Sequence, residues 1–131
     1  MFGERSAEAG RCRLGTGALA ERHPAAPGRE ECMARPIGVG LVGTGVVTTY
    51  DILPNLVRPE VRDRLNLVAV CDVVAERAKE TASGFGVSRW YADAAELARD
   101  PEVELVAIAT PVPHHLAPAL AAIAEGKHVY L

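Results

Sequence analysis

The chain has 131 residues, with 14 Lys and Arg against 17 Asp and Glu, which is the length of one ordinary domain. Hydrophobic residues make up 49% and charged residues 24% of the sequence, a composition typical of globular proteins rather than disordered or collagen-like ones. A net charge of −3 and an aromatic content of 5% argue against nucleic-acid binding, which needs a basic surface or stacking platforms. The three cysteines, Cys12, Cys32 and Cys71, lack C-x-x-C spacing, so we expect neither disulfides nor a zinc site, and a reducing, cytoplasmic location.

The first 35 residues differ from the rest of the chain. They are an aperiodic mixture of Ala, Gly, Arg and Glu, without the apolar segment of a secretory signal. Because Met33 stands directly before the first apolar run, residues 1–35 are interpreted as an over-extended translation start, with a disordered arm as the alternative. Residues 36–131 are expected to form the folded domain. No membrane span is expected, because the longest uncharged stretch, residues 105–124, contains prolines and histidines.

From residue 37 onward, short apolar runs alternate with helical patterns. Strands are predicted at residues 37–42, 67–71, 89–91, 103–109 and 128–131. Helices are predicted at 46–56, loosened by Pro54; at 74–82, stopped by Gly84; from the Asp93 cap to Pro101; and at 116–123, stopped by Gly126. Leu116, Ala119, Leu120 and Ile123 form one apolar face of the last helix. This alternation predicts an α/β fold with a doubly wound parallel sheet and right-handed crossovers.

A glycine-rich turn, Gly43-Thr44-Gly45-Val46-Val47-Thr48, follows the first predicted strand and opens the first predicted helix. The first glycine permits the tight turn, and the second lets the backbone approach a pyrophosphate at the helix N-terminus. Thr48 stands where a third Gly or Ala is usual, so strand and helix are expected to pack slightly further apart. The pattern predicts dinucleotide binding, and its alternative is a tight turn without a ligand.

Asp72 comes at the carboxyl end of the second predicted strand. An acidic side chain there would accept hydrogen bonds from both ribose hydroxyls of a dinucleotide. It could instead cap the helix that begins near Val74, or do both. A carboxylate would also repel a 2′-phosphate, and Val73 supplies no compensating guanidinium, so NAD is favoured over NADP.

The loop after the fourth predicted strand, Thr110-Pro111-Val112-Pro113-His114-His115, is expected at the same sheet edge as Gly43 and Asp72. With this loop, residues 37–131 resemble the N-terminal NAD(P)-binding Rossmann domain of the glucose-fructose oxidoreductase / inositol dehydrogenase (Gfo/Idh/MocA) family. The matching pieces are Gly43-Thr44-Gly45, Val68-Ala69-Val70-Cys71-Asp72, Ile108-Ala109-Thr110-Pro111, His115 and Gly126-Lys127-His128-Val129.

The resemblance implies an oxidoreductase that transfers a hydride to or from a sugar, polyol or related CH–OH compound. The predicted cofactor-binding residues are Gly43, Thr44, Gly45, Val46, Val47, Asp72, Thr110, Pro111 and His115. In the family the Thr-Pro loop lines the cofactor near the nicotinamide ribose, and Val112 stands where many members have Asn. His115 is predicted either to touch the cofactor or to cap the following helix, and His114 to be a solvated loop residue. Adjacent histidines point apart, so no metal site is predicted.

The family's Glu-Lys-Pro motif, with its catalytic lysine, would follow the last strand, and the sequence stops at Leu131. The chain is therefore expected to be C-terminally truncated, without the substrate domain through which any homo-oligomer would form. We name no catalytic residue and expect the fragment to be inactive. Two alternatives remain: a non-catalytic dinucleotide-binding module, and an S-adenosylmethionine-dependent methyltransferase. Against the second, Val42 precedes the turn where methyltransferases commonly carry polar residues.

Overall fold

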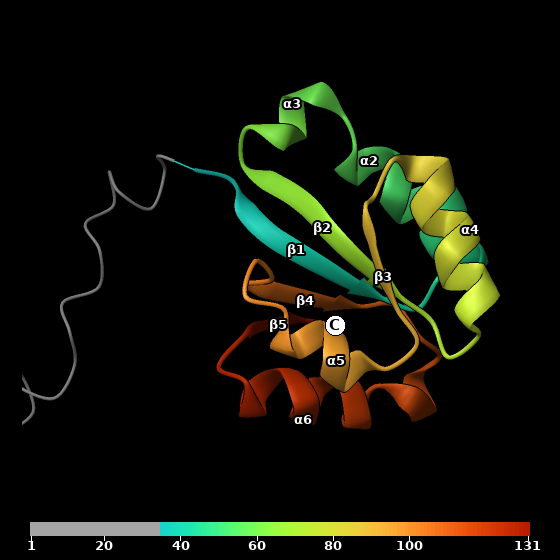
Figure 1. Ribbon diagram of the computed structural model, residues 1–131, viewed down its shortest axis with the longest axis vertical. Coiled ribbons are helices and arrows are strands. Elements are labelled where there is room, and N and C mark those ends of the chain that lie inside the picture. The colour runs from blue at the N-terminus through green and yellow to red at the C-terminus, as the bar shows by residue number, and fades with distance from the viewer. Residues whose placement is uncertain (1–34) are drawn as a thin grey trace, which may run out of the picture. The chain divides into compact units, whose positions relative to one another are not determined.

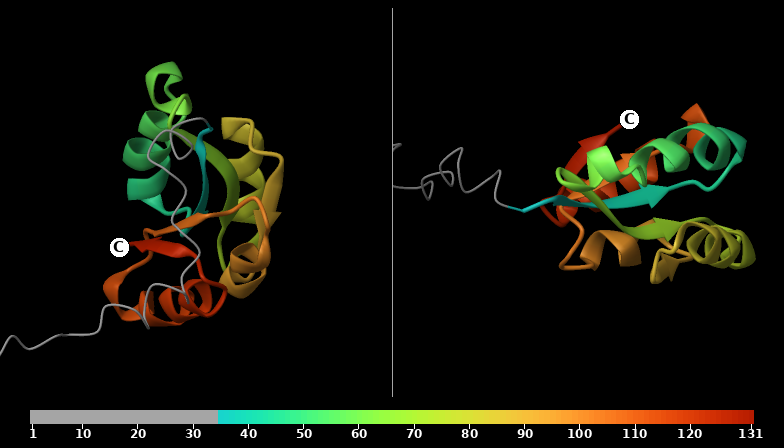
Figure 2. Two further views of the ribbon diagram at one scale, coloured as in Figure 1. Left: turned by 90° about the vertical axis from the view of Figure 1, so that its left-hand side faces the viewer. Right: turned by 90° about the horizontal axis from the view of Figure 1, so that it is seen from above.

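The computed structural model describes residues 35–131, which form a five-stranded sheet with helices on both faces (Figures 1 and 2). The expectations about residues 1–34, including Met33 as the start and the states of Cys12 and Cys32, lie outside the described residues. Within the described part, no helix is long and apolar enough to cross a membrane.

All strands of the sheet are parallel, in the order β3-β2-β1-β4-β5. Their bounds are β1 (Ile37–Val42), β2 (Leu65–Cys71), β3 (Arg89–Tyr91), β4 (Leu105–Ile108) and β5 (His128–Tyr130). This order confirms the predicted doubly wound sheet. The chain leaves β1 toward β2 on one side and later returns to β4 on the other, so a crevice opens beyond the carboxyl ends of β1 and β4.

The first connection contains the predicted helix from residue 46 to 56, with an irregular centre. Its middle is a π-helical turn, η1 (Thr48–Ile52), which continues into α2 (Leu53–Leu56), and a separate short helix α3 (Pro59–Arg62) follows. Pro54 has no N–H to donate to the carbonyl four residues back. The preceding turn widens there, and the Leu53 N–H donates to the Thr48 carbonyl, five residues back.

The second helical connection corrects one predicted boundary. Helix α4 (Ala75–Phe85) runs through Gly84 and ends at Gly86, whose φ of 68° is left-handed. Gly84 is therefore not the stop. Two glycines stand two residues apart at this helix end, and the one in the left-handed conformation ends the helix.

The remaining helices cover the other face of the sheet. In α5 (Ala94–Arg99) the predicted cap is confirmed, because the Asp93 Oδ1 accepts from the Ala95 N–H at 2.8 Å. A short 3-10 turn, η2 (Val112–His114), leads into α6 (Leu116–Ala124), after which Gly126 has a φ of 69°, as predicted for its stop.

Two apolar clusters hold these layers together. Leu41 and Val70 pack against Leu53 of α2 and Ala82 of α4 on one face of the sheet. On the other face, strand residues of opposite parity pack against α5 and α6, among them Val42, Cys71, Val106, Ile108, Leu97, Ala119 and Ala122. The predicted apolar face of α6 needs correction, because Leu116, Leu120 and Ile123 are exposed while Pro118, Ala119 and Ala122 are buried. Small side chains let α6 lie close to the sheet, which leaves the larger ones outside.

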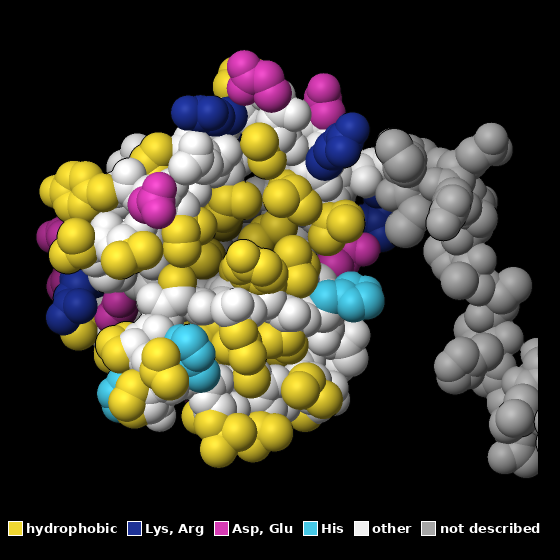
Figure 3. All heavy atoms as spheres, turned by 180° about the vertical axis from the view of Figure 1, so that it is seen from behind, with side chains coloured by type: hydrophobic (Ala, Val, Ile, Leu, Met, Phe, Trp, Pro, Cys, Tyr) yellow, Lys and Arg dark blue, Asp and Glu magenta, His cyan; other side chains and the backbone are white. Residues whose placement is uncertain are grey.

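The face that carries α2 is open beside β4 and β5. A hollow of about 440 Å³ lies there, lined by apolar side chains that include Val39, Leu41, Leu105 and Tyr130. Seen from behind, hydrophobic side chains gather on this face of the molecule (Figure 3).

At the amino edge of the sheet, Asp100 is buried and ties three segments together. Its carboxylate accepts two hydrogen bonds from the Arg89 guanidinium, at 2.8 and 3.0 Å, and one from the Tyr91 hydroxyl at 2.9 Å. The Lys127 ammonium donates to the Asp100 carbonyl at 3.1 Å. These bonds connect β3 with the turns that precede β4 and β5.

Candidate functional site

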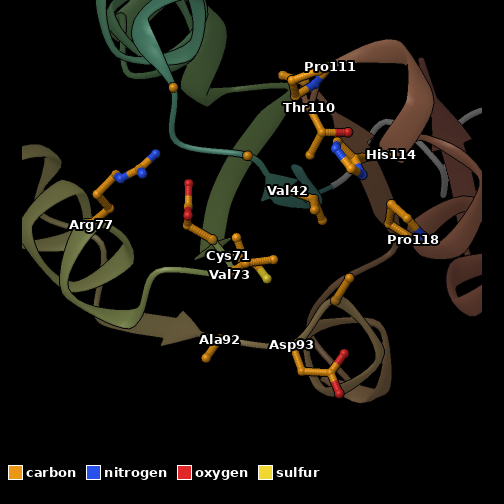
Figure 4. Close-up of a pocket in the computed structure, with 15 residues that line it drawn as sticks. Val42, Cys71, Val73, Arg77, Ala92, Asp93, Thr110, Pro111, His114 and Pro118 are labelled. Carbon is orange, nitrogen blue, oxygen red and sulfur yellow. The ribbon is translucent and has the colours of Figure 1, made fainter.

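A cavity of about 490 Å³ opens at the carboxyl ends of the strands (Figure 4). Segments that follow β1, β2, β3 and β4 contribute to its wall. Its lining residues are Val42, Gly43, Gly45, Cys71, Asp72, Val73, Arg77, Ala92, Asp93, Ala94, Ala109, Thr110, Pro111, His114 and Pro118. The edge at which the sequence predicted a ligand site is therefore hollow.

The two glycines of the turn have different structural roles. Gly43 has a φ of +96°, its N–H donates to the Cys71 carbonyl at 2.8 Å, and an added Cβ would lie 2.9 Å from the Ala109 carbonyl oxygen. Only glycine fits this position without strain. At Gly45 an added Cβ would meet nothing within 4 Å and would enter the cavity space. The backbone at Gly45 is thus open to a ligand, at the N-terminus of the helix that begins at residue 46.

Asp72 is 7% exposed and is held by three hydrogen bonds. Its Oδ2 accepts from both the N–H and the hydroxyl of Thr44, at 3.0 and 2.8 Å, and its Oδ1 accepts from the Val74 N–H at 2.9 Å. Burial alone would raise the pKa of Asp72, but these bonds and the nearby Arg77 guanidinium outweigh it and lower the pKa below its ordinary value. The carboxylate is therefore ionised at neutral pH.

This arrangement is compatible with both interpretations of Asp72, as a cap for the following helix and as a ligand of a ribose. Its side chain bonds the Val74 N–H, in the turn directly before α4, and Val74 itself is the N-cap residue without a side-chain cap. Asp72 thus fixes the entry to the helix. The same carboxylate lines the cavity, where it can meet a ligand.

The loop after β4 supplies the opposite wall of the cavity. Thr110 and Pro111 line it, and the Thr110 hydroxyl is buried without a hydrogen-bond partner among the described residues. The His115 Nε2 lies 2.6 Å from the Thr110 carbonyl oxygen, and His115 makes no side-chain cap to α6. His115 therefore holds the loop through the Thr110 backbone and does not itself line the cavity. His114, exposed as predicted, reaches the cavity (Figure 4).

Four of the sequence-predicted cofactor residues do not line the cavity: Thr44, Val46, Val47 and His115. Thr44 is 5% exposed and is hydrogen-bonded to Asp72, whereas Val46 and Val47 are 74% and 64% exposed at the start of the helix. Gly43, Gly45, Asp72, Thr110 and Pro111 are brought together as predicted.

Sequence reasoning missed Arg77, and the structure also places Cys71 in the cavity wall. Arg77 lies in the first turn of α4, near the Asp72 carboxylate, and its guanidinium points toward the cavity (Figure 4). The helical pattern from residue 74 is the signal that could have found it, because Arg77 falls in the first turn of the helix that starts at this edge of the sheet. Burial, with the nearby Asp72 carboxylate, raises the pKa of the Cys71 thiol to about 12, so this thiol stays protonated and unreactive.

The described residues around the cavity offer groups that suit a dinucleotide. The open backbone at Gly45, the ionised Asp72 and the unpartnered Thr110 hydroxyl fit a ligand that carries phosphates and hydroxyl or amide groups. Within residues 35–131, no three His, Cys, Asp or Glu side chains gather as metal ligands.

Comparison with known proteins decides the family. Residues 37–131 match the model of the Gfo/Idh/MocA proteins, described as an oxidoreductase family with an NAD-binding Rossmann fold. The chain belongs to this family. It is 36% identical over 98 residues to the inositol 2-dehydrogenase of Acidothermus cellulolyticus, covering 73% of this chain and 27% of that protein.

Solved structures agree with this assignment. The myo-inositol dehydrogenase of Lactobacillus casei, in complex with NAD(H) and myo-inositol, matches with a TM-score of 0.61 and 26% identity, covering 72% of this chain and 27% of that one. A 3-ketoreductase of Actinomadura kijaniata, in complex with TDP-benzene and NADP, matches with a TM-score of 0.64 and 25% identity, covering 72% and 29%. The chain spans about a quarter of the length of the relatives that it matches.

Proposed function

We propose that residues 36–131 bind NAD(H) in the cavity at the carboxyl edge of the sheet, as the cofactor domain of a dehydrogenase. The observation that carries the proposal is the pair formed by Gly45 and Asp72. The first presents open backbone at a helix N-terminus, and the second presents a fixed, ionised carboxylate to the same cavity. A pyrophosphate and a ribose are the groups that these two features recognise.

Each part of the site would have one task. The backbone around Gly45 would hold the pyrophosphate, Asp72 would accept from the adenosine ribose, and the Thr110 hydroxyl would meet the part of the cofactor that reaches the β4 loop. When bound, the nicotinamide would supply or accept the hydride. The residues of this chain would orient the cofactor.

The substrate class is proposed from the family. Relatives named as inositol dehydrogenases and a diol dehydrogenase support a sugar, polyol or related CH–OH compound. On its own, the 131-residue chain is proposed to bind the cofactor without turnover. Asp72 is already engaged in three hydrogen bonds within the protein, and the cavity supplies the cofactor side of a reaction that also needs a bound substrate.

For the cofactor we propose a preference for NAD over NADP, because an ionised Asp72 would repel a 2′-phosphate. Val73, next to Asp72, supplies no guanidinium that could bind a 2′-phosphate, but Arg77 borders the same cavity and carries one. The preference for NAD is therefore smaller than it would be without Arg77. Family neighbours in complex with NAD(H) and with NADP support a preference that is modest.

Titration of the purified chain with NADH, followed by fluorescence and calorimetry, tests the proposal. Gly45→Val should reduce the affinity at least about tenfold, because its side chain would occupy the space needed by the pyrophosphate, and should leave the circular dichroism spectrum unchanged. Gly84→Val is the matched control, since Gly84 also has open space around it but lies away from the cavity. Equal binding by Gly45→Val, or tighter binding of S-adenosylmethionine than of NADH, would overturn the proposal.

A further inference from the structure

The hydrogen bonds of Asp72 limit what it can still accept. An ionised carboxylate has about four acceptor sites, two on each oxygen. Thr44 fills both sites of Oδ2 with its N–H and its hydroxyl, and the Val74 N–H takes one site of Oδ1. One acceptor site remains, on Oδ1.

The side chain of Thr44 bonds the Asp72 carboxylate and does not face the cavity. It lies between the two glycines of the turn, is 5% exposed and does not line the cavity. Its two bonds tie the turn after β1 to the end of β2, in addition to the bond between the Gly43 N–H and the Cys71 carbonyl. The turn would stay closed through that backbone bond if the Thr44 hydroxyl were removed.

We infer that Thr44 is a positioning residue, which occupies Oδ2 of Asp72 and leaves Oδ1 as the single acceptor for a ribose hydroxyl. The inference rests on the proposed NAD site and replaces the sequence expectation that Asp72 takes both hydroxyls. Fixing one oxygen against Thr44 removes the rotation of the carboxylate, so the remaining site of Oδ1 is directed before the ligand arrives. The second ribose hydroxyl must then find water or another group.

The test compares Thr44→Val, which keeps the shape and the N–H but lacks the hydroxyl, with Thr44→Ser, which restores the hydroxyl. NAD affinity should fall about five-fold in Thr44→Val and recover in Thr44→Ser, the cost of one hydrogen bond that orders a charged group. In the Asp72→Asn background, Thr44→Val should cost less than about two-fold, because the residue acts through the carboxylate. Thr81→Val, on α4 and outside the cavity, is the control for the loss of a threonine hydroxyl.

A second measurement separates this inference from the proposed function, because it needs no ligand. The pKa of Asp72, followed by the carboxyl carbon signal in NMR, should rise in Thr44→Val and stay low in Thr44→Ser, since one hydrogen bond to the charged form is lost. An unchanged pKa in Thr44→Val, or an equal loss of NAD affinity in the Asp72→Asn background, would overturn the role of Thr44. Failure of the wild-type chain to bind NAD would overturn the proposed function and, with it, the ribose part of the inference.

Discussion

The Nε2 of His115 lies 2.6 Å from the carbonyl oxygen of Thr110 and fastens the β4 loop from behind. Since a carbonyl can only accept, Nε2 must carry a proton. His115 therefore holds the loop as a hydrogen-bond donor to the Thr110 carbonyl.

His115→Ala should loosen the Thr110 loop and reduce NAD affinity about five-fold, because the loop would have to be ordered on binding. Calorimetric titration with NAD⁺ measures the affinity. His128→Ala, on β5 at the opposite sheet edge, is the control, and an equal loss in that variant would contradict a local role for His115.

Gly43→Ala should lower the free energy of unfolding by about 2 kcal/mol, because it adds a Cβ at a positive φ against backbone atoms. Gly45→Ala has space for its Cβ and should change the stability by less than about 0.5 kcal/mol. Urea denaturation of the two variants measures the difference. Similar midpoints for both would show that the turn adapts and that Gly43 has no special role.

Asp100→Ala should cost about 2 kcal/mol of stability, since the buried carboxylate accepts hydrogen bonds from Arg89, from the Tyr91 hydroxyl and from the Glu102 N–H. The exposed Asp63→Ala is the control for the loss of an aspartate. Thermal and urea unfolding would measure both variants. A loss of less than about 1 kcal/mol in Asp100→Ala would mean that the network is not needed to hold the strand ends.

Acid should destabilise the folded chain through these same carboxylates. The hydrogen bonds around Asp72 and Asp100 outweigh their burial and lower the pKa of both groups below its unfolded value. Their contribution is therefore complete above about pH 4 and is lost as the pH falls through the folded-state pKa. Circular dichroism at decreasing pH should show unfolding that begins below about pH 4, and Asp100→Asn should flatten this dependence. Stability that increases on acidification would contradict the sign.

Arg77→Gln should increase the preference for NAD over NADP about five- to tenfold, because it removes the only cation that lines the cavity within the described residues. Paired titrations with the two cofactors measure the ratio. Lys79→Gln, on the same helix but outside the cavity, controls for a change in net charge. An unchanged ratio in Arg77→Gln would mean that the guanidinium does not reach the ribose.

The sequence was sufficient for the parts of the site that depend on strand ends. Gly43, Asp72 and Thr110 each follow a buried strand, and parallel strands bring their carboxyl ends to one edge regardless of side-chain detail. The role of Arg77 could not be predicted in this way, because it depends on where a long side chain on α4 reaches. The contact of His115 could not be predicted either, because the sequence does not show that its ring lies 2.6 Å from the Thr110 carbonyl oxygen rather than at the helix cap.

Two errors in the fold have a packing origin. The sequence of α6 contains a stripe of large apolar residues beside a stripe of small ones, and hydrophobicity alone favours burying the first. The sheet instead receives Ala119 and Ala122, because the close approach of the helix leaves no room for leucine. At the end of α4, the sequence offers both Gly84 and Gly86 as a stop. The structure shows that Gly86, with its left-handed φ of 68°, ends the helix.

The most direct test of the central claim, a dinucleotide site at the carboxyl edge of the sheet, is a residue-resolved NMR titration of the chain with NAD⁺. Amide shifts should change at Gly45, Val73 and Thr110, around the cavity, and should stay constant at Asp100 and Lys127, at the opposite edge. Changes at the amino edge or in the hollow beside Val39, or no change at millimolar NAD⁺, would contradict the account.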